Sequence, residues 1–247
     1  MTKPLIYSVL LTLGSLISST ANADLFLGIY AGASIWHGDF SGELGEDPQD
    51  FNDLGFGNDN YNSFYVAVEL FGLPEIRLAQ TNIDTTATGT LNSSFSLDDI
   101  SYPVNSDLTT DLALKSTDLT VYWQVLDNSI SADIGLTARH INGQIEVTDG
   151  TISDSVDFET IVPMAFLRAR FDIPFTGWYV EADTQFIGFG GDNYSDSTAK
   201  IGWQFESIAD LGVNLGYRKM SLNVEDLDRF NADLDLSGPF ASATFHF

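Results

Sequence analysis

The amino-acid sequence predicts an all-β protein: an antiparallel up-and-down transmembrane β-barrel of about ten strands, with eight or twelve as the alternatives. Three observations predict it. An export signal opens the chain, and apolar and polar residues then alternate with a period of two. The connections between alternating segments are short at one end of the predicted barrel and mostly longer at the other, as in outer-membrane barrels.

The N-terminal residues have the three parts of a secretory signal. Lys3 supplies the positive charge, Leu5 to Ile17 is apolar, and Ala21-Asn22-Ala23 is an A-x-A cleavage site. The alternative is an N-terminal membrane anchor, but the apolar run is shorter than the roughly 20 residues that span a bilayer. We therefore expect a cleavable signal peptide at 1–23 and an outer-membrane β-barrel at 24–247.

The composition excludes several classes of function. The chain has 35 acidic and 10 basic residues, and removing residues 1–23 removes Lys3 and no acid, so the net charge changes from −25 to −26. Nucleic acid is therefore excluded as a partner, because phosphate binding requires the opposite sign. The absence of cysteine excludes a lipoprotein anchor, a thiol nucleophile and disulfides. The 44% hydrophobic content argues against a disordered chain.

Ten segments alternate with the period of a strand. They lie near residues 25–35, 61–72, 75–86, 110–126, 130–139, 159–173, 178–186, 199–206, 211–218 and 241–247. Short turns are expected near 72–75, 126–129, 174–177 and 207–210, on the periplasmic side. Longer outer loops are expected near 38–60, 87–108, 148–157, 190–197 and 225–232.

The two faces of these segments differ in chemistry, with charged residues on one parity and large apolar residues on the other. A soluble periplasmic barrel that binds a small ligand would place its apolar face inside, whereas a membrane barrel turns that face to lipid. Aromatic residues of the apolar parity collect at the periplasmic strand ends, which favours the membrane barrel. We expect an aromatic girdle of Trp123, Phe171, Trp178, Trp203, Phe205 and Phe245, and an assembly signal at Phe247.

The charged parity then lines the lumen. A narrow interior tolerates charges only where they are paired or hydrated, so we expect a charge network and a largely plugged lumen. Arg168 and Arg170 are the expected principal members, because acids lie on the neighbouring predicted strands. The full network is expected to contain Glu69, Arg77, Asp118, Asp133, Arg139, Arg168, Arg170, Glu181, Asp183 and Arg218.

The first predicted outer loop is acidic and contains no basic residue. Clustered carboxylates can bind divalent cations, but no segment has the EF-hand spacing, and a solvated acidic loop is the favoured interpretation. We therefore expect no cofactor and no metal site, with divalent cations at the acidic loops as the alternative. The acids are Asp39, Glu43, Glu46, Asp47, Asp50, Asp53 and Asp59.

A ten-stranded barrel also raises the possibility of an outer-membrane hydrolase, either similar to the omptin proteases or acting on lipid acyl chains. By parity, His37 and His140 lie near the outer rim but face lipid, and His246 faces inward at the periplasmic end. Neither arrangement puts a general base into an outer cleft. We therefore expect no catalytic and no cofactor-binding residues, with the membrane-embedded hydrolase as the alternative.

A Gly-Gly pair suggests a family. The segment Phe189-Gly190-Gly191-Asp192, the preceding Trp178-Tyr179-Val180-Glu181-Ala182 and the terminal Phe247 resemble the proteobacterial outer-membrane proteins named for this pair (OMP_w_GlyGly). A phosphate-binding glycine loop is not expected there, because a strand and not a helix follows it. The resemblance implies a β-barrel in the outer membrane, with no established activity.

Together these observations predict a non-enzymatic integral protein of the Gram-negative outer membrane. It would act as a narrow, cation-biased, porin-like pore or as a surface or structural protein of the cell envelope with acidic outer loops. The expected partners are outer-membrane lipid, lipopolysaccharide, periplasmic chaperones and the barrel-assembly machinery.

Overall fold

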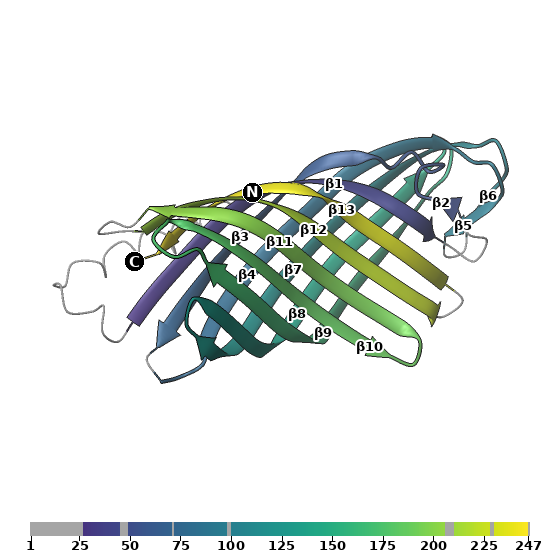
Figure 1. The fold of residues 1–247 in the computed structure, drawn as a ribbon. Coiled ribbons are helices and arrows are strands. Elements are labelled where there is room, and N and C mark those ends of the chain that lie inside the picture. Colours follow the sequence, from purple (N-terminus) through teal and green to yellow (C-terminus); the bar gives the residue numbers. More distant parts are fainter. Residues whose placement is uncertain are drawn as a thin grey trace, which may run out of the picture.

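A computed structural model describes residues 27–246 apart from 45–48, 71, 98–99, 206–209 and 228–229. The expected signal peptide and the terminal Phe247 lie outside the described residues. Ten antiparallel strands form the barrel, and pairing of the last with the first closes it (Figure 1). They are β1 (Leu27–Leu44), β3 (Asn58–Leu70), β4 (Glu75–Thr90), β7 (Asp107–Asp127), β8 (Ile130–Thr148), β9 (Ser153–Asp172), β10 (Trp178–Phe189), β11 (Asp192–Phe205), β12 (Asp210–Leu227) and β13 (Phe230–His246).

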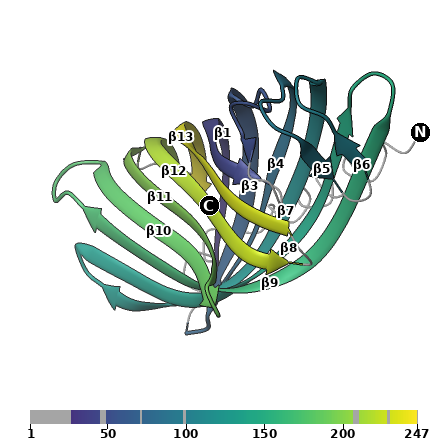
Figure 2. The same cartoon turned by 90° about the vertical axis from the view of Figure 1, so that its right-hand side faces the viewer.

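Every barrel strand pairs with its neighbours in sequence, which makes the topology an up-and-down barrel. We call the end where β3 connects to β4, β7 to β8, β9 to β10 and β11 to β12 the inner end, and the opposite end the outer end. Three short strands belong to the outer end: β2 (Gln49–Asp50), β5 (Phe95–Leu97) and β6 (Ile100–Tyr102). Figure 2 shows β5 and β6 beside the wall of β7, β8 and β9. In the described part of the chain, no helix is long and apolar enough to cross a membrane.

The structure confirms ten strands but corrects their lengths at the outer end. The expected loops at 148–157, 190–197 and 225–232 are mostly strand, with only 149–152, 190–191 and 228–229 between the paired elements. The expected loops at 38–60 and 87–108 also contain the ends of β1, β3, β4 and β7 and the short strands. These stretches have polar outward residues and therefore a composition typical of loops. Their antiparallel strand pairing nevertheless continues, for example between β8 and β9 as far as Thr148 and Ser153.

Two tight turns explain how the strands can run so far. Gly190 and Gly191 have φ of 68° and 118°, values that side chains with a Cβ rarely adopt, so the pair forms a two-residue hairpin turn between β10 and β11. At the turn after β8, the backbone N–H groups of Ile152 and Thr151 donate to the Asp149 carboxylate. These two hydrogen bonds lower the pKa of Asp149 below its ordinary value.

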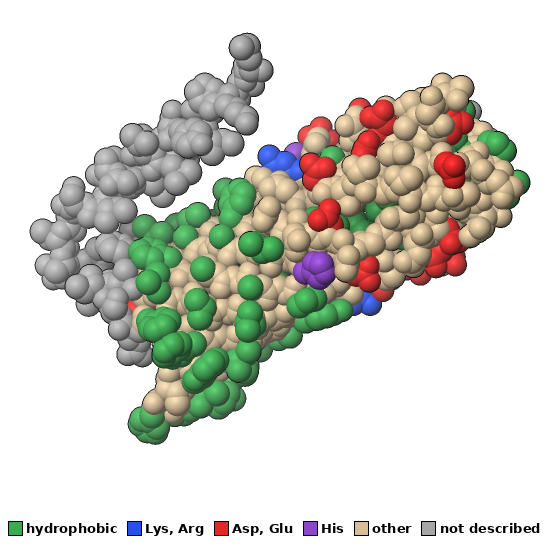
Figure 3. All heavy atoms as spheres, turned by 90° about the horizontal axis from the view of Figure 1, so that it is seen from above, with side chains coloured by type: hydrophobic (Ala, Val, Ile, Leu, Met, Phe, Trp, Pro, Cys, Tyr) green, Lys and Arg blue, Asp and Glu red, His purple; other side chains and the backbone are tan. Residues whose placement is uncertain are grey.

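The barrel wall has two zones, which differ in what faces outward. In the inner zone, outward positions are apolar and exposed, as in the laterally paired row of Leu78, Leu119, Ala138 and Pro163 across β4, β7, β8 and β9. Four residues further along each strand toward the outer end, the outward positions of the same strands are polar: Asn82, Lys115, Asn142 and Glu159. Figure 3 shows apolar side chains gathered over one half of this face and acidic ones over the other.

The inward face changes in the opposite sense at about the same height. On β7, inward Asp118 and Thr120 of the inner zone give way to Leu112 and Leu108 of the outer zone, and all four are buried. The outer zone therefore has the polarity of a soluble β-protein and the inner zone that of a membrane barrel. The predicted rule of charge inside and apolar residues outside holds for the inner zone and is wrong for the outer zone.

An apolar core fills the outer zone. It contains Trp36, Phe40 and Tyr61 from the wall and Phe51, Leu54 and Phe56 from the connection between β1 and β3, all at most 5% exposed. Phe95 and Tyr102 of the β5–β6 hairpin are also buried in it, and the Tyr102 hydroxyl donates to the Val147 carbonyl at 2.9 Å. The long outer connections thus fold inward and fill the barrel mouth.

Candidate functional site: a charge cluster across the lumen

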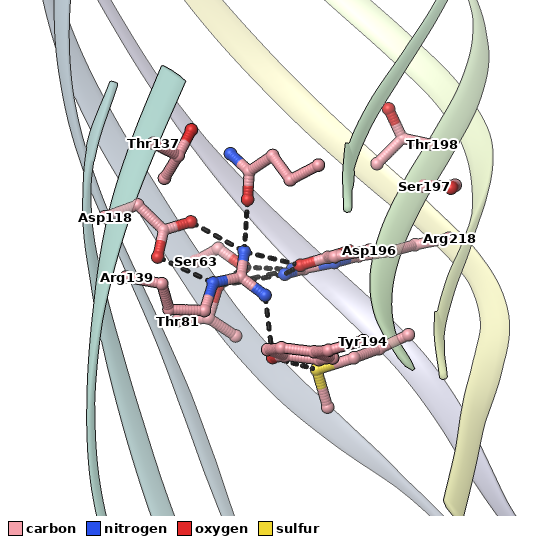
Figure 4. Close-up of polar contacts among 12 residues, drawn as sticks. Ser63, Thr81, Asp118, Thr137, Arg139, Tyr194, Asp196, Ser197, Thr198 and Arg218 are labelled. Atoms are coloured by element: carbon pink, nitrogen blue, oxygen red, sulfur yellow. Dashed lines mark hydrogen bonds and ion pairs between the residues drawn. The ribbon is translucent and has the colours of Figure 1, made fainter. Parts of the chain in front are cut away.

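The inner zone places charged side chains in the lumen, because its inward positions alternate with the apolar outward ones. The most buried charged residue is Arg139 of β8, with a side chain 1% exposed. Its Nε and Nη2 donate to the two carboxylate oxygens of Asp118 on β7 at 2.8 and 2.6 Å (Figure 4). This two-pronged contact fixes the guanidinium plane, which a lysine could not do.

The same guanidinium reaches across the lumen to the opposite wall. Its Nη1 donates to the Tyr194 hydroxyl at 2.7 Å, and its Nη2 donates to Asp196 of β11 at 2.9 Å. Nη2 also donates to the side-chain oxygen of Gln185 on β10. Arg139 thus joins strands β7, β8, β10 and β11 through one side chain.

A second arginine completes the cluster. Arg218 of β12 donates to both oxygens of Asp196, at 2.9 and 2.7 Å, and stacks over the Trp36 ring with its Cζ 4.7 Å from the centroid. It also donates to the hydroxyls of Ser63 and Thr81 on β3 and β4. The Arg139 cluster, defined as Asp118, Arg139, Gln185, Tyr194, Asp196 and Arg218, therefore crosses the lumen (Figure 4).

A second layer of charges lies nearer the inner end. Arg168 is ion-paired with Asp133 and lies 3.9 Å from Glu75, with its guanidinium over the Tyr122 ring. Arg170 pairs with Asp172 at 2.7 Å and lies 3.8 Å from Glu181. Glu181 also forms an ion pair with Lys200 at 2.8 Å. Arg168 of β9 thus reaches beyond the adjacent β8 to Tyr122 of β7 and Glu75 of β4, while Glu181 and Lys200 join the adjacent strands β10 and β11.

The structure places all ten residues of the expected network on inward positions, but it divides them. Asp118, Arg139 and Arg218 belong to the Arg139 cluster, and Asp133, Arg168, Arg170 and Glu181 belong to the inner layer. Glu69 accepts from the Tyr30 hydroxyl at 2.8 Å, Asp183 accepts from Thr198, and Arg77 lies over the Tyr65 ring. The most buried member is Arg139 and not Arg168 or Arg170.

Three members of the Arg139 cluster lie outside the expected network: Gln185, Tyr194 and Asp196. Tyr194 and Asp196 fall in the segment expected to be a loop, although both share the parity of Lys200. Continuing the alternation from Lys200 back through Thr198 would have placed them in the lumen. Gln185 has the right parity but carries no charge, so nothing in the sequence distinguishes it.

The six aromatic residues of the expected girdle all lie on outward positions near the inner end. Trp178 stacks on Trp203 with ring centroids 6.1 Å apart, and the ring centroids of Trp203 and Phe205 are 4.0 Å apart. All six are between 38% and 52% exposed, so large aromatic surfaces face away from the protein. Trp and Tyr rings at such positions are typical of a membrane–water interface.

The described acids of the first expected outer loop are spread over three strands and a turn. Asp39 and Glu43 lie on β1, Asp50 on β2 and Asp59 on β3, while Glu46 and Asp47 lie outside the described residues. Asp53 lies in the turn before Gly55. Among the described residues, no three of His, Cys, Asp or Glu are grouped as a metal site would require.

The three histidines lie where their parity predicts. His37 and His140 point outward, where His37 contacts Asn60 at 3.1 Å and His140 contacts Glu159 at 2.8 Å. His246 points inward near the inner end and stacks on Tyr30, with ring centroids 4.1 Å apart. The described residues thus place no histidine in the Arg139 cluster.

Comparison with solved structures identifies the fold. The outer-membrane protease OmpT from Escherichia coli superposes with a TM-score of 0.53 at 10% identity, covering 93% of this chain and 99% of that one. The fold is that of an outer-membrane β-barrel. A major outer-membrane protein from Thermus thermophilus aligns at 13% identity with a TM-score of 0.40, covering 90% of this chain and 99% of that one. No protein-family model and no curated protein sequence matches the chain.

Proposed function

We propose that the protein is an integral, non-enzymatic protein of the Gram-negative outer membrane that presents a rigid acidic surface and does not conduct ions at rest. The Arg139 cluster carries this proposal, because it joins five strands across the lumen with a guanidinium that is almost inaccessible to solvent. The apolar core of the outer zone lies along the same lumen, on the outer side of the cluster. An ion would have to disrupt both.

The membrane location is supported by the two-zone wall and by the fold comparison. The exposed apolar belt of the inner zone would lie in the hydrocarbon, with the inner end in the periplasm after export and signal cleavage. The acidic outer zone would then extend outside the cell and face lipopolysaccharide. Chaperones and the barrel-assembly machinery would be the partners during biogenesis.

Membership of the Gly-Gly family is part of the proposal. The turn at Gly190 and Gly191 supports it with a physical reason for the pair, since both residues have positive φ. Alanine or a larger residue would strain this two-residue turn. No family model matches the chain, so the assignment depends on these short motifs.

A narrow pore is the second candidate. The observation in its favour is a cavity of about 100 Å³ in the lumen beside the Arg139 cluster. The acidic outer zone would bias such a pore toward cations. It would conduct only if the cluster and the outer core both move aside.

Single-channel recording separates the two candidates. Protein refolded in detergent, with folding verified by heat-modifiable gel mobility, is inserted into a planar bilayer, and a refolded porin serves as the positive control. We expect a silent bilayer at all voltages that the porin withstands. Steady conductance steps would refute the closed barrel and establish the pore, with ion selectivity measured from the reversal potential. Hydrolysis of a lipid or peptide that His140→Ala abolishes would refute the non-enzymatic assignment.

A further inference from the structure

The lumen contains a cavity on the inner side of the Arg139 cluster. It is lined by inward side chains of β1, β3, β4, β10, β11 and β13 together with members of the cluster. Arg77 and Lys200 lie on its inner side, since each is four residues closer to the inner end than Thr81 and Asp196 of the same strands. Its volume of about 100 Å³ is several times what one ordered water needs.

The cavity wall carries charges of both signs. Its basic side chains are Arg77, Arg139, Lys200 and Arg218, and its acidic ones are Asp118, Asp183 and Asp196. Lys200 is also paired at 2.8 Å with Glu181, which lies just outside the lining, so positive and negative charges are balanced around the cavity. An anion would therefore be recognised here by a basic side chain that forms no ion pair of its own.

Arg77 is such a side chain. Arg139, Lys200 and Arg218 each form an ion pair, whereas Arg77 forms none with any described residue. Its guanidinium lies over the Tyr65 ring, with Cζ 4.7 Å from the centroid, and its Nε is buried without a hydrogen-bond partner. A stacked guanidinium still presents its N–H groups at its edge, so Arg77 offers the cavity a charge and unused donors.

The surroundings hold Arg77 in this position. A Cβ on Gly32 of β1 would lie 2.3 Å from the Tyr65 ring, so the absence of a side chain at residue 32 lets the ring lie against β1 inside the lumen. Hydroxyl groups complete the wall: Ser34, Ser63, Thr81, Thr198, Ser242 and Thr244. Hydroxyls can donate to an anion without adding charge of their own.

We propose that this cavity is a binding site for a small oxyanion of the size of inorganic phosphate, with Arg77 as the principal ligand. The volume of about 100 Å³ is below the roughly 300 Å³ at which pockets for drug-sized ligands begin, so its size favours a small tetrahedral oxyanion. The apolar outer core closes the other side of the cluster, so the anion enters from the inner end. The site is independent of whether the barrel conducts ions.

Phosphate titration of the refolded full chain tests the site. The thermal unfolding midpoint in detergent is measured with increasing inorganic phosphate at constant ionic strength, with chloride as the balancing anion. We expect the midpoint to rise with phosphate and to saturate, because a ligand that binds only the folded state stabilises it. A midpoint that does not change as phosphate replaces chloride at constant ionic strength would overturn the proposal and leave a water-filled cavity.

Variants locate the site. Arg77→Gln should weaken phosphate binding about tenfold or more, since it removes a charge-assisted hydrogen bond, and Arg77→Lys should retain part of the affinity. Lys115→Gln is the matched control, because it removes one positive charge from the outward face and should leave binding unchanged. Heat-modifiable mobility establishes that each variant is folded, and Thr244→Val provides a second, milder change in the wall. Binding that survives Arg77→Gln, or that Lys115→Gln removes equally, would overturn the assignment.

Discussion

Replacing Arg139 with alanine removes the centre of the Arg139 cluster and tests how the lumen is held together. The substitution deletes hydrogen bonds to four partners: Asp118, Gln185, Tyr194 and Asp196. Asp196 keeps Arg218 as a partner, but Asp118 loses the ion pair that binds both of its oxygens. One carboxylate is therefore left buried, with a side chain only 9% exposed.

The expected loss of stability follows from this imbalance. Removing one partner of a buried ion pair typically costs about 3–5 kcal/mol, mostly because the other charge stays buried and unpaired. We expect Arg139→Ala to fall in this range. Replacing both partners, as Arg139→Met with Asp118→Leu, should recover part of the loss because no charge remains uncompensated on that side.

Urea unfolding in detergent micelles, followed by tryptophan fluorescence and by heat-modifiable mobility, measures these free energies. Lys115→Ala is the control, since this outward, exposed lysine should change the free energy of unfolding by no more than about 0.5 kcal/mol. A loss for Arg139→Ala no larger than that of Lys115→Ala would refute the reasoning. The reasoning would also be refuted if the double variant Arg139→Met with Asp118→Leu lost as much free energy of unfolding as the sum of the losses of its two single variants.

Four further outcomes are expected. Arg168→Ala should destabilise the barrel by about 3–5 kcal/mol in the same urea assay because it leaves Asp133 buried without its partner; an unchanged midpoint would count against the inner layer. Leu54→Ala should cost about 2–5 kcal/mol as a cavity in the outer core, whereas Leu119→Ala on the lipid face should cost less. Leu119→Arg should cost about 2–4 kcal/mol in lipid vesicles, and Ala113→Arg, on the same face of β7 but in the outer zone, close to nothing; equal costs would contradict the two zones. Gly190→Val should cost roughly 1–2 kcal/mol because valine is strained at positive φ, and Gly188→Val, which precedes the turn, should not show this backbone penalty.

The period-2 alternation was enough to predict the strand count, the closed topology and the inward parity of the lumen charges. The prediction was accurate where apolar side chains face outward, because only a membrane barrel has that polarity. It failed at the outer end, where Ser153 to Asp157 and Asp192 to Ser197 look like loops by composition. In the structure these segments pair as strands whose outward side chains face solvent.

The composition of the Arg139 cluster could be predicted only in part. Parity shows that Asp118, Arg139 and Arg218 point inward, but it does not show which residues meet across a lumen. That depends on the relative stagger of strands distant in sequence, such as β8 and β11. The apolar core of the outer zone was missed for a related reason, since Phe51, Leu54 and Phe95 come from connections that fold back into the barrel.

The two-zone wall is tested most directly by the depth of single cysteines in the membrane. The chain has no cysteine, so each introduced thiol is unique. Cysteines at Ala113, Thr117, Leu119 and Val121, all outward on β7, are labelled with a fluorophore in lipid vesicles and quenched by lipids brominated at known depths. We predict strong quenching at Leu119 and Val121, weak quenching at Thr117 and none at Ala113. Equal quenching at all four positions, or quenching that is strongest at Ala113, would contradict a barrel whose lipid belt ends between Leu119 and Lys115.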